Sequence, residues 1–188
     1  MPPTAPDFGP RIDPYALYEG QRGCDPAAKP GVLAFRDLVL AAYPSTRSLG
    51  IGRERGRPGA SEHKEGRAWD WGVDARSQGH IAADLIDWLL ATDRHGNRHA
   101  PARRLGIMYV IWNHRIWHAN RADTGWTPYT GESPHTDHMH FSFGWAGARK
   151  ETTWWTERGP GSPGDALSAA VPSQPRAPSP SADRVGRL

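Results

Sequence analysis

Residues Ser61–Asp70, SEHKEGRAWD, place a histidine and an aspartate seven positions apart. A second stretch, PHTDHMHFSF at Pro134–Phe143, places two histidines on either side of one methionine. Imidazole and carboxylate groups suit a small divalent ion, above all zinc. Three protein ligands with an open fourth position are typical of a catalytic zinc rather than a structural one. The two stretches therefore predict one zinc site, held by His63, Asp70 and His140.

The residues around two of these ligands read as strands. In AWDWGV, Ala68–Val73, alternation puts Asp70 on one face and its two flanking tryptophans on the other. A carboxylate on a buried strand must be paired, protonated or bound to a metal. In the expected strand 138–143, His138 and His140 share a face. Two adjacent imidazoles are seldom needed for packing, so these strands favour a metal site.

The composition indicates one domain with a loop-rich fold. The 188 residues are enough for one well-buried core, and the 21 glycines and 18 prolines argue against a helical bundle. The net charge of +3 fits an anionic polymer such as nucleic acid or bacterial wall, and does not choose between them. The single cysteine, Cys24, excludes an intrachain disulfide and a cysteine-rich zinc site.

Hydrophobic periodicity predicts an α+β fold, a small and mostly antiparallel sheet flanked by helices. The predicted helices cover 30–42, 78–93 and 145–155, the second of them with Ser77 as its N-cap. The predicted strands cover 48–53, 68–73, 105–112, 115–118 and 138–143, and the segments 96–104 and 125–134 are predicted to be loops.

The chain is expected to divide into three parts. Residues 1–24 form an extended arm, residues 25–155 form the catalytic domain, and residues 156–188 form a tail rich in proline, serine and glycine. Such a tail is expected to be disordered, because it lacks the apolar residues that a core needs. No apolar run is long enough to span a membrane. The N-terminus also lacks the basic and then apolar pattern of a secretory signal.

The stretch SEHKEGRAWD reads as S-x-H-x-x-G-x-A-x-D and resembles the first motif of the D-alanyl-D-alanine carboxypeptidase family of zinc peptidases. That superfamily includes L-alanyl-D-glutamate endopeptidases of phage lysins and, more distantly, lysostaphin-type and hedgehog-type domains. The stretch DHMH, Asp137–His140, resembles the second motif of the family. The similarity covers residues 25–155 and is nearest to a wall-associated actinobacterial branch.

This resemblance implies a peptidase that acts on the stem peptides of peptidoglycan, either as a D-Ala-D-Ala carboxypeptidase or as an L-Ala-D-Glu-type endopeptidase. It implies one Zn²⁺ per chain on His63, Asp70 and His140, a hedgehog-like antiparallel sheet, and action on the cell wall, outside the cell. The small residues Gly66 and Ala68 match motif positions where bulk would crowd the metal loop. We expect a monomer that binds neither nucleic acid nor membrane.

The general base has two candidates. The carboxypeptidase branch of the resembled family uses an acid three residues before the last ligand, which here is Asp137. The His-x-His branch uses a histidine two residues before it, which here is His138. The motif favours Asp137, whereas strand alternation favours His138. Arg53 is the expected cation for the developing oxyanion or for a terminal carboxylate of the substrate.

Other residues near the two motifs are expected to line the substrate cleft. Ser61 belongs to the first motif, and the aromatic residues Trp126, Tyr129 and Trp145 flank the second. Core packing is the alternative for each aromatic residue.

The remaining histidines near the motifs receive weaker expectations. His135 is expected to be an exposed loop residue rather than a hydrogen-bond partner of a metal ligand. His114 and His118, on the expected hairpin, should line the edge of the groove.

Two other functions compete with the peptidase. The segment NHRIWHAN, Asn113–Asn120, is faintly similar to His-Asn-His nucleases and favours a metal-dependent nuclease. A non-catalytic, zinc-containing domain that binds the cell wall is the second competitor. A nuclease of that type needs its histidines and asparagine on one compact unit, whereas SEHKEGRAWD lies far from NHRIWHAN in the sequence.

Overall fold

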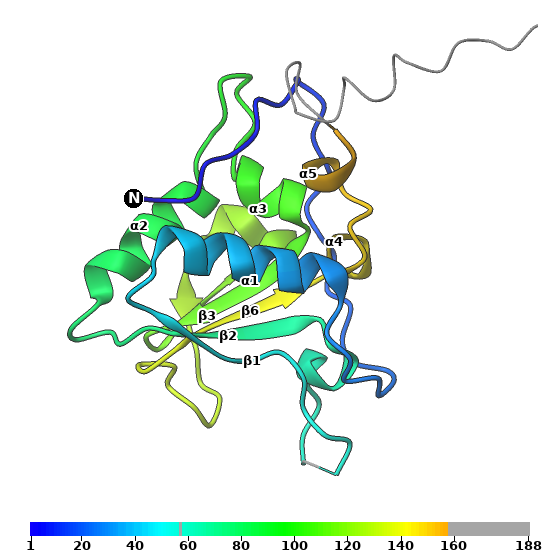
Figure 1. Ribbon diagram of the computed structural model, residues 1–188, viewed down its shortest axis with the longest axis vertical. Helices are drawn as coiled ribbons and strands as arrows, with labels where there is room; N and C mark the ends of the chain where they lie inside the picture. Colours follow the sequence, from blue (N-terminus) through cyan, green and yellow to red (C-terminus); the bar gives the residue numbers. More distant parts are fainter. Residues whose placement is uncertain (57, 158–188) are drawn as a thin grey trace, which may run out of the picture.

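The computed structural model describes residues 1–56 and 58–157 of the chain, and the tail predicted for residues 156–188 therefore lies almost entirely outside the described residues. The centre of the fold is one six-stranded sheet in the order β1-β2-β6-β3-β4-β5 (Figure 1). The strands are β1 (Arg47–Gly50), β2 (Ala68–Gly72), β3 (Ile107–Trp112), β4 (Arg115–His118), β5 (Thr127–Pro128) and β6 (Met139–Phe143). Every neighbouring pair is antiparallel, which confirms the predicted α+β class.

Helices pack against this sheet and leave its other face open (Figure 1). They are α1 (Pro30–Ala42), α2 (Gly79–Leu89), α3 (Ala100–Leu105), α4 (Trp145–Ala148) and α5 (Thr153–Thr156), with the 3₁₀ turns η1 (Glu62–Glu65) and η2 (Ala119–Thr124). None of the helices in the described residues is both long and apolar enough to cross a membrane.

The main core lies between α1 and one face of β2 and β6. The ring of Phe35 meets the rings of Trp69, Phe141 and Phe143 edge to face, at centroid distances of 5.7, 5.1 and 5.4 Å. All four side chains are fully buried. Burying an aromatic side chain of this kind stabilises the fold by about 1.5–3 kcal/mol. This packing fixes which face of the two strands points into the core.

The opposite face of the sheet carries polar side chains, because successive residues of a strand alternate between faces. The strand register sets two rows of directly opposed residues across this face. One row is Asp70, His140, Ile111 and Ile116, and the other is Ser142, Tyr109 and His118. Residues from four strands are thereby brought to one surface.

The first 29 residues form no helix or strand and run over the domain. The backbone N–H groups of Arg22 and Gly23 donate to Glu65 Oε1 at 2.9 and 2.7 Å, which ties the segment to η1. Closer to the N-terminus, the ring of Tyr18 lies 6.4 Å from that of Tyr109. The N-terminal segment therefore reaches the polar face of the sheet.

Several of the predicted element boundaries are wrong. The helix expected over 78–93 ends at Leu89, and the strand expected over 105–112 begins at Ile107. The strand expected over 48–53 ends at Gly50, whose φ of +134° interrupts the extended backbone. The helix after β2 is capped by Gln78, since Ser77 lies in a turn in which its N–H and hydroxyl donate to Asp74. The helix expected over 145–155 is two short helices, because Lys150 adopts a φ of +64° between them.

Both predicted loops contain regular structure. The segment 96–104 includes most of α3, a short helix with Pro101 in its first turn and a buried apolar side. The segment 125–134 includes the two-residue strand β5, which pairs with β4. Neither element is long enough to show a period in the sequence.

Candidate metal centre

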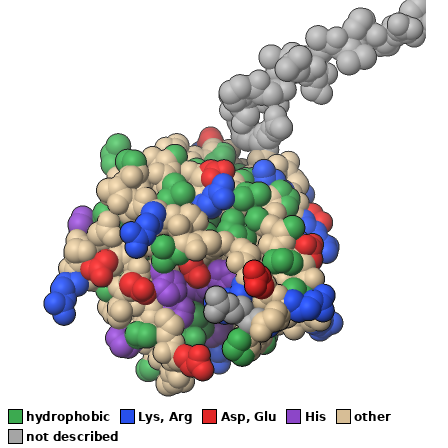
Figure 2. Space-filling model, turned by 60° about the horizontal axis from the view of Figure 1, so that its bottom comes forward, with side chains coloured by type: hydrophobic (Ala, Val, Ile, Leu, Met, Phe, Trp, Pro, Cys, Tyr) green, Lys and Arg blue, Asp and Glu red, His purple; other side chains and the backbone are tan. Residues whose placement is uncertain are grey.

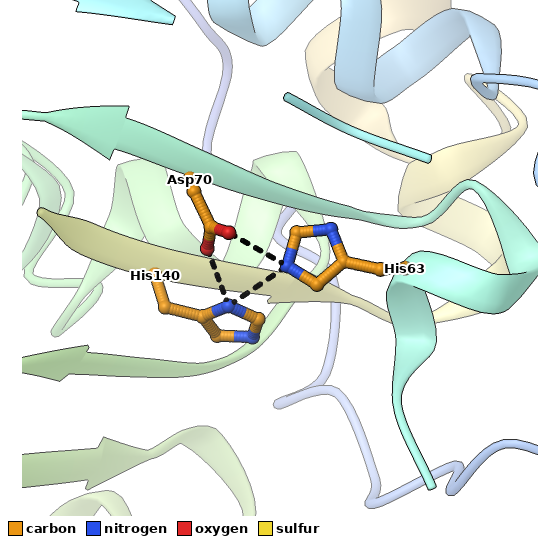
Figure 3. A group of neighbouring side chains, drawn as sticks. All are labelled: His63, Asp70 and His140. Carbon is orange, nitrogen blue, oxygen red and sulfur yellow. Dashed lines mark hydrogen bonds and ion pairs between the residues drawn. The ribbon is translucent and has the colours of Figure 1, made fainter. Parts of the chain in front are cut away.

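Three side chains from three elements converge on the polar face of the sheet (Figure 3). His63 comes from η1, Asp70 from β2 and His140 from β6. His63 Nε2 lies 3.1 Å from Asp70 Oδ2 and 3.3 Å from His140 Nδ1, and His140 Nδ1 lies 2.8 Å from Asp70 Oδ1. One atom of each residue, all within 4.8 Å of one another, can serve as a metal ligand.

The hydrogen bond of His63 at its other ring nitrogen decides its tautomer. His63 Nδ1 lies 2.6 Å from the carbonyl oxygen of Ile51. A carbonyl oxygen only accepts, so Nδ1 carries a proton and the neutral ring has a lone pair at Nε2. That lone pair faces the Asp70 carboxylate, and two acceptors at this distance require a cation or a proton between them. The donor set therefore fits a bound metal ion.

The spacing of the ligand atoms fits as well. Ligands at about 2.0–2.1 Å from a tetrahedral ion lie about 3.3 Å from one another. The two nitrogens lie 3.3 Å apart, and each lies near a different oxygen of Asp70, at 2.8 Å for His140 and 3.1 Å for His63.

His140 is supported from behind by a chain of hydrogen bonds. Its Nε2 lies 3.1 Å from Ser142 Oγ, which donates to Glu62 Oε2 at 3.3 Å. The hydroxyl of Tyr109 donates to the same carboxylate oxygen at 2.5 Å. Burial and the neighbouring Glu62 carboxylate raise the pKa of Tyr109, so this hydroxyl keeps its proton. Partners of this kind hold a metal-ligating imidazole in one orientation.

The charge state of the three residues also suits metal binding. Burial disfavours the ionised form of Asp70, but the polar contacts with the His140 and His63 rings outweigh it and lower its pKa. Burial lowers the pKa of His140, which favours the neutral ring that can bind a metal. The cluster thus consists of a carboxylate and imidazoles with available lone pairs.

The local backbone presents His63 through a short capped turn. Ser61 accepts a hydrogen bond from His63 N at 3.4 Å as the N-cap of η1, and Gly66 ends the turn with a φ of +63°. A Cβ on Gly66 would lie 2.0 Å from the carbonyl oxygen of Ala27. The close approach of Ala27, in the segment before α1, therefore requires a glycine at position 66. A larger residue here would collide with that segment, and not with the metal loop as the motif implies.

Two hollows of about 610 and 450 Å³ adjoin the cluster. Both are lined by His63 and Asp70, and both include Arg53 in their walls. Figure 2 shows histidine side chains gathered in a hollow, with acidic and basic side chains around it. A ligand of peptide size therefore has access to the three residues.

The two candidates for the general base, His138 and Asp137, lie in different surroundings. His138 lines the hollow beside the cluster, with Nε2 3.9 Å from Asp70 Oδ1, and its Nδ1 donates to Asp137 Oδ1 at 2.7 Å. The Asp137 side chain is 76% exposed and lines a separate hollow together with Thr46 and Arg47. The carboxylate thus contacts the back of the His138 ring, whereas the ring faces the cluster.

His135 is buried, and the expectation that it is an exposed loop residue is wrong. Its ring lies 4.6 Å from the ring of His138 and 5.9 Å from that of His140. Burial, with a smaller contribution from the nearby histidines, lowers the pKa of His135 to about 4. The His135 ring is therefore neutral and forms part of the wall of the site. Its Nδ1 lies 2.7 Å from the carbonyl oxygen of Ser133, a contact that the sequence does not reveal.

The other predicted site residues divide into two groups. Arg53, Ser61 and Tyr129 line the hollow next to the cluster. Trp126 and Trp145 are not among the described residues that line either hollow. Trp145 instead lies under the guanidinium groups of two arginines, and Trp126 packs against the core.

Sequence reasoning missed Glu62 and Tyr109, and it did not use Ser142. Ser142 follows His140 by two residues, so strand alternation could have placed it on the same face. No signal in the sequence places Tyr109 beside it, because the register between β3 and β6 depends on the folded sheet.

Comparison with known proteins places the chain in one family. The family model described as VldE, C-terminal domain, matches residues 24–140, which is more than half of the 188 residues and includes all three members of the cluster. No curated protein and no solved structure matches the chain significantly. The chain therefore belongs to the family of the VldE C-terminal domain.

Proposed function

We propose that this chain is a zinc-dependent peptidase that hydrolyses the stem peptides of peptidoglycan, as a carboxypeptidase or an endopeptidase. The observation that carries the proposal is the convergence of His63, Asp70 and His140 at the wall of an open hollow, with His138 beside them. Two imidazoles and one carboxylate with an open side are typical of catalytic zinc in hydrolases. The resemblance of SEHKEGRAWD and DHMH to the zinc peptidases supplies the substrate class, and with it action at the cell wall.

Zinc, when bound, would supply a Lewis acid that polarises a carbonyl oxygen and makes water easier to deprotonate. The residues of the chain then have three tasks. His63, Asp70 and His140 hold the ion. His138 Nε2 accepts a proton from the water that attacks the scissile carbonyl, and returns it to the amine that leaves as the C–N bond breaks. Arg53, in the wall of both hollows, offers a positive charge to a developing oxyanion or a substrate carboxylate.

We assign the base to His138 because of how it is held. The Asp137 carboxylate accepts from Nδ1 and leaves Nε2 facing the cluster. A carboxylate that orients a catalytic imidazole in this way also stabilises its protonated form. Asp137 therefore acts as an orienting residue, which reverses the order that the motif alone suggests.

The nuclease alternative has less support. Asn113 and His114 form the turn between β3 and β4 with φ values of 43° and 63°. Neither is among the described residues that line the hollows beside the metal cluster. We therefore keep the nuclease, and the non-catalytic wall-binding domain, only as outcomes of the following experiment.

Incubating zinc-loaded protein with purified peptidoglycan is expected to release D-alanine or shortened stem peptides. Mass spectrometry of the muropeptides before and after incubation identifies the bond that is cleaved. A chelator should abolish the release and added zinc should restore it, because the reaction depends on the Lewis acid. If metal-replete protein leaves all stem peptides intact, the proposal is wrong. Cleavage of plasmid DNA in a parallel reaction would support the nuclease, and binding to the wall without cleavage would support the non-catalytic domain.

Replacing His138 with Ala is expected to lower kcat by roughly 10²- to 10⁴-fold, the usual contribution of a general base. Replacing Asp137 with Ala should cost less, on the order of tenfold, since it removes only an orienting partner. Both variants should keep zinc affinity within a few-fold of the unmodified protein, which chelator competition measures. A larger loss in the Asp137 variant than in the His138 variant would reverse the assignment.

A further inference from the structure

A third hollow of about 430 Å³ continues the one that contains the metal cluster. The two hollows share Tyr109, Ile111 and Tyr129 in their walls. The residues found only in the third hollow are Tyr18, Ile116, His118, Asn120 and Arg121. One groove therefore leads from the cluster towards β4 and η2.

The floor of this groove is the sheet itself. In the register, Ile111 directly opposes both His140 and Ile116, and Tyr109 directly opposes both Ser142 and His118. Two strand spacings separate β6 from β4, which amounts to about 10 Å. An extended peptide rises about 3.3 Å per residue. The far end of the groove therefore lies about three residues of extended peptide from the cluster.

The far end is positively charged. Arg121 is exposed, and its guanidinium makes no ion pair or hydrogen bond within the described part of the chain. The neighbouring Asn120 adds an exposed amide. Burial, and then the charge of Arg121, lower the pKa of His118, so this ring is neutral near pH 7. No aspartate or glutamate is among the described residues that line this hollow.

The opposite end of the groove differs in charge. The hollow on the β1 side is lined by Arg53 together with Glu54 and Glu132, so its charges are mixed. Of these three hollows, as lined by the described residues, the one on the β4 side alone combines a cation with no carboxylate in its wall. This asymmetry distinguishes the two directions in which a peptide can lie across the cluster.

Two aromatic rings flank the β4 end. Tyr18, carried by the N-terminal segment, is 61% exposed although its ring lies beside Tyr109. Tyr129 forms part of the wall in the region that the two hollows share. Apolar walls with a few convergent polar groups are the usual composition of a site that binds a small ligand.

We propose that the hollow of Tyr18, His118, Asn120 and Arg121 is a subsite for a carboxylate of the peptide substrate, located about three residues from the bond that is cleaved. Arg121 binds the carboxylate, and Tyr18 packs on the peptide beside it. This inference rests on the proposed function for the identity of the peptide, and it names the feature of the stem peptide that the groove selects.

The test compares the affinities of peptides for two zinc-loaded proteins, one with and one without the Arg121 side chain. Both carry His138→Ala, which slows turnover during the measurement. The probes are a stem tetrapeptide, L-Ala-D-Glu-L-Lys-D-Ala, and derivatives in which each free carboxylate is replaced in turn by a carboxamide. Calorimetry should show that one replacement weakens binding by roughly tenfold, the value of one charge-assisted contact. With Arg121→Gln added, that same replacement should have no further effect. The matched control is Arg76→Gln, which removes an exposed arginine that lines none of these hollows.

For each carboxamide derivative, the loss of affinity relative to the unmodified tetrapeptide is compared between the His138→Ala protein and the same protein with Arg121→Gln. The subsite is overturned if these losses are the same in both proteins for every derivative. Failure of the proposed function gives a different pattern. In that case no stem peptide is cleaved by protein with an intact His138, whether or not binding depends on Arg121. Arg121-dependent binding without cleavage would leave the subsite in place and reject the peptidase.

Discussion

Replacing Asp70 with Asn is expected to remove zinc binding and peptide hydrolysis together. Both oxygens of Asp70 face ligand nitrogens, His140 Nδ1 at 2.8 Å and His63 Nε2 at 3.1 Å. An amide removes the only negative charge of the cluster and places an N–H₂ donor against one of these nitrogens. Loss of an outer partner of a metal ligand costs about 10- to 100-fold in affinity. Loss of a ligand itself should exceed the upper end of that range, about 100-fold.

Metal content by mass spectrometry and affinity by chelator competition measure this effect without reference to catalysis. The control is Asp87→Asn, which removes an exposed carboxylate from α2. It should retain one zinc per chain and full activity. Circular dichroism should show that the Asp70 variant stays folded, because the sheet and α1 do not depend on the carboxylate for packing. Stoichiometric zinc in the Asp70 variant would mean that the ion binds elsewhere.

The cluster could be predicted from the sequence because two of its members lie on strands with clear alternation. Trp69 and Trp71 flank Asp70, so the carboxylate had to lie on the face opposite the core. The spacing of His138 and His140 suggested that both lie on that face. The structure begins β6 only at Met139, so His138 reaches the site from the preceding loop.

What the sequence could not show depends on contacts between distant segments. Glu62 lies within the first motif, yet its role appears only where the register brings Tyr109 and Ser142 to it. His135 looks like a loop residue until the turn folds it against His138. The helix α3 was not predicted, because its six residues are too few to show an amphipathic period in the sequence.

The short segment before β2 also carries a buried ion pair that no sequence pattern reveals. Arg67 is fully buried, and its Nε and Nη2 donate to Glu65 Oε2, each at 2.8 Å. Its Nη1 donates to the carbonyl oxygen of Phe143 at 2.8 Å, and Nη2 also donates to the carbonyl of Glu19. Arg67 therefore joins the N-terminal segment, η1 and the end of β6.

Burial disfavours the ionised form of Glu65, but hydrogen bonds from Arg22 N, Gly23 N and Arg67 outweigh it and lower its pKa below the usual 4.5. A depressed carboxyl pKa contributes stability above the unfolded value and loses it as pH falls through the folded value. The ion pair should therefore act fully near pH 7 and fade below about pH 4.5.

Replacing Arg67 with Met is expected to lower the free energy of unfolding by about 3–5 kcal/mol at pH 7, because it leaves Glu65 as an uncompensated buried charge. Urea denaturation followed by tryptophan fluorescence measures the change. The matched control is Arg149→Met. Arg149 lies over the same Trp145 ring, at 4.6 Å against 5.1 Å for Arg67, but it is exposed. Its loss should cost no more than about 1 kcal/mol, the value of an exposed cation–π contact.

The pH dependence separates the ion pair from simple loss of packing. If the buried charge of Glu65 causes the loss, the gap between the Arg67→Met variant and the unmodified protein narrows as pH falls below 4.5. A loss caused by packing alone would stay constant with pH. Adding Glu65→Gln to the Arg67 variant should recover part of the stability at pH 7, since the amide carries no charge to bury. Equal losses for Arg67→Met and Arg149→Met would show that the carboxylate is not what makes Arg67 necessary.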